Sequence, residues 1–360
     1  MKHLLRSLST VVFLAVLLQG CASGINDTAR AGTERPAEQW PDAAQTDAAL
    51  PETDLQAQPG QPASRGFAVA KEWQPLRRAL ARDGLSGAKV DALLATLGPR
   101  LEAPMGRKMV ELYRSNFLRP KEAGKPAKSD PNAVYKGVVT EQNAALCRKY
   151  LKDHARAFAQ AQKQYGVPSS VAVALLFVET RLGTILKDVP ENALYTLASM
   201  SQSTTLESIP TWYAKMPGYE QHRDWFAATM PKRAAWAYNE TKALVRYMVA
   251  NGIQAQHMPG SFYGAIGLCQ FMPSNLDQYA VDGNGDGVID LYQADDAIFS
   301  LSNFLKKHGW KANGDRASWH AVLMRYNKST KYANTILALA DLTAHPKAAP
   351  AAAKKPGQAK

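Results

Sequence analysis

A single glutamate, Glu179, stands where a carboxyl group could act as a catalytic acid. The residues before it, 171–178, are all apolar (VAVALLFV), so a helix over this stretch would be buried on every side. Pro168 and the two serines after it favour a helix start, and Gly183 favours a helix end. A carboxyl group at the end of a buried helix loses hydration, which raises its pKa. Such a group stays protonated near neutral pH and can donate its proton to a leaving oxygen.

The position of Glu179 alone leaves a structural explanation equally open. An ion pair with Arg181, or with a lysine near the helix end, would also account for a carboxylate at this place. The choice between the two roles depends on residues elsewhere in the chain.

Residues 282–293 contain a second motif with chemical content. Their spacing matches a calcium-binding EF-hand loop, in which side-chain oxygens alternate along the chain and a glycine makes the tight turn. The twelfth position normally carries a bidentate glutamate; glutamine there predicts reduced affinity, for which Asp295 or Asp296 would have to compensate. An ordinary surface turn rich in Asn, Asp and Gly is the alternative. The predicted calcium ligands are Asp282, Asn284, Asp286, the carbonyl of Val288, Asp290 and Gln293.

Helical patterns dominate the part of the chain that must position these groups. Apolar residues recur at helical spacing within residues 73–80 and 90–97, and a helix with a cationic face is predicted over residues 141–165. Alternating, strand-like segments are scarce. We therefore predict a mainly α protein with one folded region, residues 67–343, whose pattern allows two lobes.

The segments outside this region have a different composition. Residues 21–66 contain five prolines and almost no large apolar side chains, which predicts a disordered tether. Residues 344–360 consist mostly of Ala, Pro and Lys, which predicts a disordered tail. Within the folded region, Cys147 and Cys269 are predicted to be buried free thiols.

The first twenty residues resemble a bacterial secretory signal. Lys2 and Arg6 precede an apolar stretch, and Leu-Gln-Gly comes directly before Cys21. This pattern is similar to the bacterial lipobox, which predicts removal of residues 1–20 and acylation of Cys21. Ala22 after the cysteine implies, by the same resemblance, an outer-membrane lipoprotein facing the periplasm. A plain signal peptide with an incidental cysteine is the alternative.

The formal net charge of +12 favours anionic partners. Composition alone does not choose between nucleic acid, anionic lipid and the carboxylate-rich peptides of a cell wall. We find no nucleic-acid-binding motif in the sequence, and therefore expect no nucleic-acid partner. A merely solvated basic surface explains the charge equally well.

Three separated blocks of sequence resemble one known family. They are FVETRLG at residues 177–183, GAIGLCQFMPS at residues 264–274, and RYNKS at residues 325–329 followed by Tyr332. In order and spacing they resemble the soluble and membrane-bound lytic murein transglycosylase B family, a glycoside hydrolase family 103-like group with an SLT-type, lysozyme-like domain. The resemblance extends, with gaps, from about residue 73 to residue 342.

The resemblance implies a lysozyme-like helical catalytic core with an additional helical lobe. It also implies cleavage, without water, of the β-1,4 bond between N-acetylmuramic acid and N-acetylglucosamine. Glu179 would first protonate the leaving oxygen while the N-acetyl group of the substrate stabilises the anomeric centre. The same glutamate would then take the proton of the C6 hydroxyl, leaving a 1,6-anhydromuramoyl end. Substrate assistance replaces the second carboxylate of most glycosidases.

The resemblance further implies which side chains contact the glycan. Lys232 departs from a pair of arginines that is frequent in the family, so Arg233 alone offers a planar bidentate grip on a carboxylate. Each aromatic residue at a matching position is explained equally well by core packing. The matching positions are Ser261, Gln270, Lys232, Arg233, Trp236, Tyr326, Asn327 and Tyr332.

The implied partner is the glycan of peptidoglycan, with no cofactor for catalysis and with any calcium ion in a structural role. Two alternatives remain: a muramidase-type hydrolase, and a catalytically silent lipoprotein that binds peptidoglycan or calcium. The sequence leaves open exo or endo action, and whether cell-wall remodelling proteins bind the chain.

Overall fold

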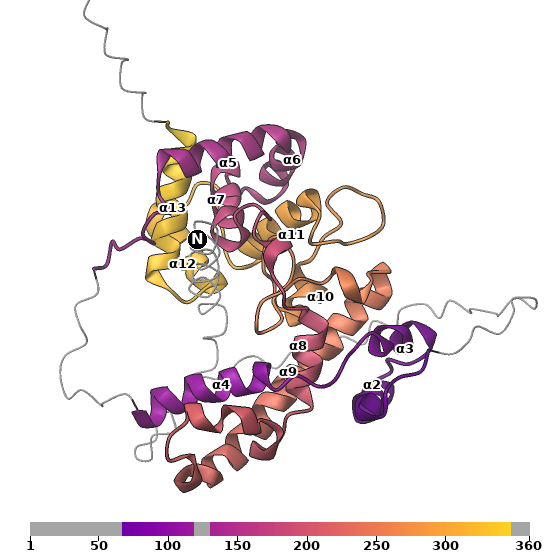
Figure 1. Ribbon diagram of the computed structural model, residues 1–360. Helices are drawn as coiled ribbons and strands as arrows, with labels where there is room; N and C mark the ends of the chain where they lie inside the picture. The colour runs from indigo at the N-terminus through magenta and orange to yellow at the C-terminus, as the bar shows by residue number, and fades with distance from the viewer. Residues whose placement is uncertain (1–66, 119–129, 347–360) are drawn as a thin grey trace, which may run out of the picture.

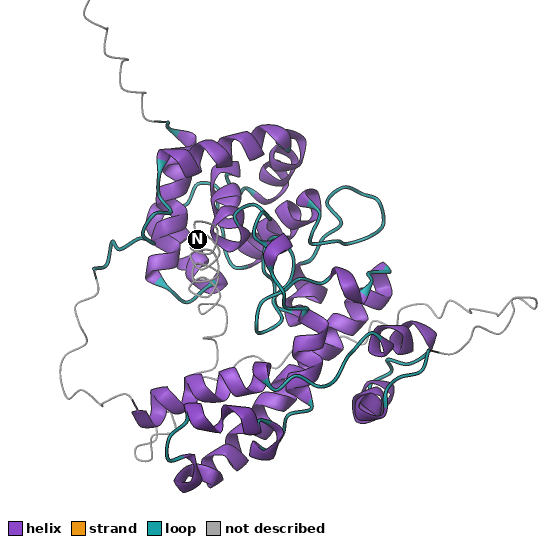
Figure 2. Cartoon of the chain, in the orientation of Figure 1, coloured by secondary structure: helices purple, strands orange, loops and turns teal. Residues whose placement is uncertain are grey.

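The computed structural model describes residues 67–118 and 130–346, which form helices joined by loops and short turns (Figures 1 and 2). Within these ranges, β-structure is limited to three isolated bridges, all between residues 192 and 271. The prediction of a mainly α protein is confirmed. The predicted signal segment, the lipidation site Cys21, the predicted tether and residues 347–360 lie outside the described residues.

The helices fall into short N-terminal ones, one long central one and a C-terminal group. α9 is 29 residues long, whereas α10 is a single turn. In chain order they are α2 (Gln74–Arg82), α3 (Ala88–Ala95), α4 (Ala103–Tyr113), α5 (Glu141–Asp153), α6 (Ala155–Tyr165), α7 (Ser169–Thr180), α8 (Ala193–Ser201), α9 (Arg223–Asn251), α10 (Leu276–Tyr279), α11 (Ala294–Lys307), α12 (Arg316–Tyr326) and α13 (Thr330–Ala344).

Two hydrophobic cores divide these helices. The larger core surrounds α7, whose residues 171–178 are all buried, and α5, α11 and α13 pack against it. The smaller core lies between α4 and the first half of α9, and includes Tyr113 and Met230. Figure 1 shows α4 and this half of α9 side by side, away from the α5–α7 group. The smaller core forms the additional helical lobe that was expected.

α9 takes part in both cores. Its first half contributes Phe226 and Met230 to the smaller core, and its second half contributes Leu244 and Met248 to the larger one. Pro231 lies inside the helix without ending it, although an interior proline removes a backbone hydrogen bond. Because α9 is continuous, one element fixes the two cores relative to each other.

Two helix boundaries differ from the predicted ones. The helix predicted over residues 141–165 is interrupted at His154, whose φ of −119° and ψ of 34° leave the helical region. The interruption lets α5 pack on α7 and α13 while α6 turns to pack on α11. α7 ends at Thr180, with Arg181 in the left-handed conformation, and not at Gly183.

Two further properties concern the described residues only. None of their helices is both long enough and apolar enough to cross a membrane. Cys147 and Cys269 are buried free thiols, as the sequence predicted.

Candidate active site

Glu179 lies in the last turn of α7 and is enclosed by protein, with 2% of its surface exposed. Burial strips water from the ionised form, which raises the pKa of Glu179 to about 8. Tyr332 in the first turn of α13 donates a hydrogen bond to Glu179 Oε1, which opposes part of this rise in pKa. Among the described residues, no second carboxylate acts on the pKa of Glu179. The side chain is therefore mostly a neutral acid at pH 7.

The chain reverses direction immediately after Glu179. The amide of Leu182 reaches back to the carbonyl of Leu176, the bonding pattern of a left-handed helix cap. In the described ranges the non-glycine residues with positive φ are Arg181, Leu182 and Gln270. Such conformations cost of order 1–3 kcal/mol each and persist only where the surroundings enforce them. All three lie next to Glu179 or in the loop that faces it.

That loop, residues 258–271, is called the site loop below. Thr180 Oγ1 donates to the carbonyl of Leu268 at 2.9 Å, which ties the end of α7 to the site loop. Gly183 permits this approach, because a Cβ there would lie 2.5 Å from a methyl carbon of Leu268. Glu179 also acts on the pKa of the Cys269 thiol, which burial raises. The site loop therefore lies beside the carboxyl group.

Two polar side chains of the site loop were predicted to contact the substrate. Ser261 is 4% exposed, and its Oγ accepts the amide hydrogens of Tyr263 and Ala265 at 3.2 and 3.0 Å. Because both of these are accepted bonds, the hydroxyl hydrogen of Ser261 is left to donate. Gln270 is also buried, and its Nε2 donates to the carbonyl of Gly267 at 3.0 Å. Both side chains are thus held in place by the loop itself.

The third of the three sequence blocks, residues 325–329 and Tyr332, lies at the end of α12 and the start of α13 and contacts the site loop and Glu179. Tyr326 Oη donates to the carbonyl of Cys269 at 2.5 Å, and the Tyr326 and Tyr332 rings are stacked 6.4 Å apart. Asn327 is 2% exposed, yet neither atom of its amide group has a hydrogen-bond partner within the described residues. A buried amide without partners is destabilising. Its amide group is therefore a candidate for contact with a ligand, as the resemblance implied.

Three predicted residues come from α9. Lys232 is exposed and makes no ion pair with any described residue. Arg233 is half-buried, and its charge acts on the pKa of Tyr263 in the site loop. Trp236 is half-buried between the two cores, so core packing accounts for its ring. Of the three, Arg233 has the clearest relation to the site loop.

The sequence did not indicate the contribution of α4. Tyr263 Oη donates to Glu111 Oε2 at 2.7 Å, and the guanidinium carbon of Arg107 lies 3.6 Å from the centre of the Phe262 ring. Arg107 and Glu111 are four residues apart and so share a helix face. That spacing gives no sign of which distant segment the face meets.

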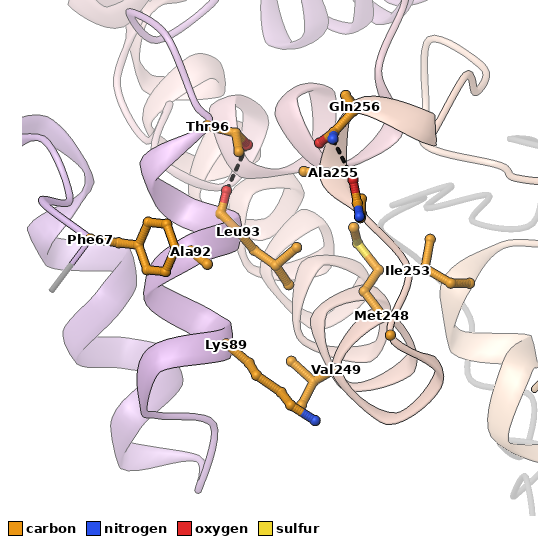
Figure 3. Close-up of a pocket in the computed structure, with 12 residues that line it drawn as sticks. Phe67, Lys89, Ala92, Leu93, Thr96, Met248, Val249, Ile253, Ala255 and Gln256 are labelled. Atoms are coloured by element: carbon orange, nitrogen blue, oxygen red, sulfur yellow. Dashed lines mark hydrogen bonds between the residues drawn. The ribbon is translucent and has the colours of Figure 1, made fainter. Parts of the chain in front are cut away.

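A separate cavity of about 460 Å³ lies between α3 and the C-terminal end of α9 (Figure 3). Its walls are mainly apolar, with Leu93, Met248 and Ile253 among the lining residues. Of the described residues that line it, Lys89 is the one with a titratable side chain. No Asp or Glu of the described residues lines this cavity, so it does not supply the acid that the resemblance implies.

Side chains of the EF-hand-like loop hold it in a compact turn through hydrogen bonds within the loop. Asp282 accepts the amide hydrogens of Gly285 and Gly287 at 2.6 and 2.8 Å. Asn284 Nδ2 lies 2.9 Å from Asp286 Oδ2, so these two side chains meet across the loop. The chain thus adopts the compact turn that the motif predicts.

Position twelve of this loop differs from the expected geometry. Gln293 is exposed at the start of α11. Asp296, three residues later, is 1% exposed and accepts the amide hydrogens of Gly283 and Asp290 at 2.8 and 2.6 Å. Among the described residues, no three His, Cys, Asp or Glu side chains gather closely enough to hold a metal by themselves. A cation would need the amide and carbonyl oxygens too, an all-oxygen set that suits calcium.

Comparison with known proteins identifies the family. A family model described as the transglycosylase SLT domain matches residues 68–321. The chain belongs to this family. The membrane-bound lytic murein transglycosylase B of Escherichia coli (strain K12) is 30% identical over 223 residues, which are 60% of this chain and 54% of that relative. The match therefore spans about half the length of the curated SLT-domain relative.

Solved structures share the fold. The Escherichia coli lytic transglycosylase SLT35 in complex with calcium is 22% identical, with a TM-score of 0.54 over 77% of this chain and 94% of that chain. SltB3 from Pseudomonas aeruginosa in complex with NAG-NAM-pentapeptide is 19% identical, with a TM-score of 0.55 over 78% and 80%. The predicted lysozyme-like helical core of an SLT-family protein is confirmed.

Proposed function

We propose that the protein is a lytic murein transglycosylase, a carbon–oxygen lyase that cleaves the glycan strands of peptidoglycan. Membership of the SLT family and the name of the Escherichia coli relative support the reaction class. The observation that carries the proposal is Glu179, an enclosed carboxyl group with a pKa of about 8. A carboxylic acid that stays neutral at physiological pH can protonate a glycosidic oxygen.

The proposed reaction uses Glu179 twice. Its proton passes to the oxygen between N-acetylmuramic acid and N-acetylglucosamine as the bond from that oxygen to the anomeric carbon breaks. The N-acetyl group of the substrate stabilises the anomeric carbon in this proposal, in place of the second carboxylate that most glycosidases use. The C6 oxygen then bonds to that carbon and its proton returns to Glu179, giving a 1,6-anhydromuramoyl end.

Other site residues fit supporting roles. The hydroxyl hydrogen of Ser261 and the unpartnered amide of Asn327 can bind polar groups of the sugars. Tyr332 donates to Glu179 and would stabilise the carboxylate that forms after the first proton transfer. Gln270 is held rigidly by the site loop. These contacts orient the substrate and need no cofactor.

Product analysis on purified sacculi tests this function. The mature chain should release muropeptides that are lighter by one water than hydrolysis products, as measured by mass spectrometry. Glu179→Gln should release none. Reducing-end products would instead assign a muramidase-type hydrolase, and binding to sacculi without products would assign a silent wall-binding protein.

Glu240 provides a matched control for the Glu179 substitution. It is also buried, burial also raises its pKa, and it accepts the amide hydrogen of Ser274 at 2.9 Å. An amide oxygen can accept the same bond, so Glu240→Gln should keep full activity. Loss of activity in both variants would indicate a general effect of removing a buried glutamate.

We further propose that the EF-hand-like loop holds a structural calcium ion. The residues that would hold it are Asp282, Asn284, Asp286, the carbonyl of Val288 and Asp290, with the carboxylate of Asp296 in place of the exposed Gln293. The all-oxygen set, the contact between the Asn284 and Asp286 side chains, and the bonds of Asp296 to the loop backbone support this. The likeness to SLT35, whose structure contains calcium, adds support.

We also propose that the protein is an outer-membrane lipoprotein facing the periplasm. The support is the lipobox-like sequence before Cys21 and the membrane-bound relative in Escherichia coli. In this proposal residues 1–20 are removed, residues 21–66 tether the enzyme, and residues 67–343 act on the wall.

A further inference from the structure

The cavity between α3 and the C-terminal end of α9 has no part in the proposed reaction. Its volume of about 460 Å³ falls in the range of about 300–1,000 Å³ that ligand sites usually have. Leu93 and Met248 belong to the larger core, whereas Val249 and Ile253 are only partly buried against it (Figure 3). A mainly apolar hollow of this size therefore suits an apolar ligand.

The cavity lies where the N-terminal segment joins the folded region. Phe67, the first described residue, lines the cavity together with Ala92 of α3 and is 55% exposed. Two residues later the chain is fixed, because Gln74 Nε2 donates to the carbonyl of Val69 at 2.9 Å. The segment before residue 67 is therefore joined to the folded region at the wall of the cavity.

The charge of this segment is opposite to that of the chain as a whole. Residues 36–64 contain five acidic residues and no Lys or Arg, within a chain of net charge +12. Leu50 and Leu55 are the large apolar residues closest to the cavity along the chain, and two carboxylates lie between them. Residues 50–55, LPETDL, therefore combine two apolar side chains with two negative charges.

Lys89 of α3 supplies the matching charge. It lines the cavity, its side chain is exposed, and it makes no hydrogen bond or ion pair with any described residue. An unpaired cation beside an apolar hollow is complementary to apolar side chains that flank carboxylates.

The connection between the two partners is short. Leu55 is twelve residues before Phe67, and a chain of that length spans at most about 40 Å. A short flexible link keeps a binding segment at an effective concentration in the millimolar range. A segment with few apolar residues can therefore occupy the cavity without any other contact.

We propose that residues 50–55 dock in this cavity, with the two leucines against its apolar wall and Glu52 or Asp54 paired with Lys89. The docking involves no residue of the proposed active site and does not depend on the proposed reaction.

Docking shortens the tether of the proposed lipoprotein. With all 46 residues of 21–66 free, the typical reach is roughly 37 Å, and with the 29 residues of 21–49 free it is roughly 30 Å. The docked segment thus holds the folded region closer to the proposed lipid anchor, and its release lets the folded region work further from the membrane. This consequence rests on the proposed anchor, whereas the docking itself does not.

A zero-length cross-link tests the docking. The mature chain with Cys21→Ala, which keeps it free of lipid, is treated at low ionic strength with a carbodiimide, which joins a carboxylate to a contacting amine with loss of water. Peptide mass spectrometry should find Lys89 joined to Glu52 or Asp54. Lys163 of α6 is exposed and does not line the cavity, so it should be joined to them far less.

Two pairs of substitutions in the segment sharpen the result. Leu50→Ser with Leu55→Ser should lower the yield of the Lys89 cross-link about tenfold, because the apolar contribution to docking is lost. Ala48→Ser with Ala57→Ser changes the same segment outside the motif and should leave the yield unchanged. Neither pair touches the folded region, so neither can act by unfolding it.

A change in the cavity itself gives an independent measurement. Ala92→Phe fills the cavity from α3 and should lower the yield as the leucine pair does. An unchanged yield in Ala92→Phe or in the leucine pair would mean that charge alone brings the segment to Lys89, which overturns docking in the cavity. Absence of any cross-link from Lys89 to residues 50–55 would overturn it too.

The remaining outcomes assign a different occupant. Chains grown with light and heavy nitrogen are mixed, and cross-links between light and heavy chains would mean that a second copy fills the cavity. A fatty acyl chain extracted from the natural protein, and absent from Ala92→Phe, would assign the cavity to a lipid. The muropeptide products are measured separately, so failure of the docking leaves the proposed reaction standing.

Discussion

At the residue scale, the burial of Glu179 both supports proton donation and lowers stability at high pH. Its folded pKa of about 8 lies above the ordinary value of 4.5. Below pH 4.5 both states hold the proton; between 4.5 and 8 only the folded state does. The free energy of unfolding should therefore fall by up to about 1.4 kcal/mol per pH unit in this window, from this residue alone.

Glu179→Gln removes this pH dependence. The stability of the variant relative to the natural chain should increase from pH 5 to pH 8 and then level off. Urea unfolding at a series of pH values measures the difference. Parallel stability curves for the two proteins would show that Glu179 titrates normally and would remove the basis of the proposed acid.

Tyr332→Phe should change both the rate and its pH dependence. The lost hydrogen bond stabilises the carboxylate form, so the pKa of Glu179 should rise and the alkaline limb of the rate profile should move to higher pH. The rate should fall roughly 10- to 100-fold, because a bond to a developing charge is lost. Tyr238→Phe, whose hydroxyl group bonds to Asp83, is the remote control. If the alkaline limb of the rate profile does not shift in Tyr332→Phe, Tyr332 does not influence the pKa of the catalytic acid.

At the element scale, close approach between α8 and the site loop depends on Gly264. Its φ is 83°, and a Cβ would lie 2.4 Å from Leu197 of α8. Gly84 has a similar φ of 79° but nothing within 4 Å of its Cβ position. Gly264→Ala should therefore lower the free energy of unfolding by about 2–4 kcal/mol, and Gly84→Ala by about 1 kcal/mol. Chemical unfolding of both variants measures this, and equal losses would mean that contact with Leu197 is unimportant.

Calcium should stabilise the EF-hand-like loop. We expect its addition after chelator treatment to raise Tm by about 5 °C, because the ion binds only the folded loop. Asp296→Asn should abolish the rise, whereas Gln293→Ala should preserve it, since Gln293 is exposed. Differential scanning calorimetry of the natural chain and both variants, with and without calcium, measures these changes in Tm. If calcium does not change Tm, the loop does not bind the ion. If only Gln293→Ala abolishes the rise, the twelfth ligand is Gln293 and not Asp296.

At this scale, the elements that could be predicted from the sequence are those encoded by a local pattern of residues. The apolar run before Glu179 predicted a buried α7, and alternating Asp and Asn predicted the turn at residues 282–290. The twelve-residue rule pointed to Gln293 because it counts along the chain, and the sequence left open whether Asp295 or Asp296 would compensate; it is Asp296, in the first turn of α11, that bonds to the loop. The bond between Tyr263 and Glu111 joins positions 152 apart, and nothing local to either residue encodes it.

At the scale of the whole molecule, attachment to the membrane is predicted to depend on Cys21. Cys21→Ala should leave the folded region intact and release the protein into the soluble periplasmic fraction, because acylation of the sulfur would be lost. Fractionation with immunoblotting measures this, and mass spectrometry of the natural chain should show the lipid. Continued sedimentation of the variant with membranes would point to a different anchor.

The continuity of α9 has a mechanical consequence. Pro231 interrupts its backbone ladder within the smaller core, whereas residues 238–243, which span the junction, contain no such break. Because the helix is unbroken across the junction and contributes side chains to both cores, the two cores should move as one unit and not as hinged halves. If the proposed glycan substrate binds, adjustment to its shape would then come from loops and side chains and not from a movement of one core against the other.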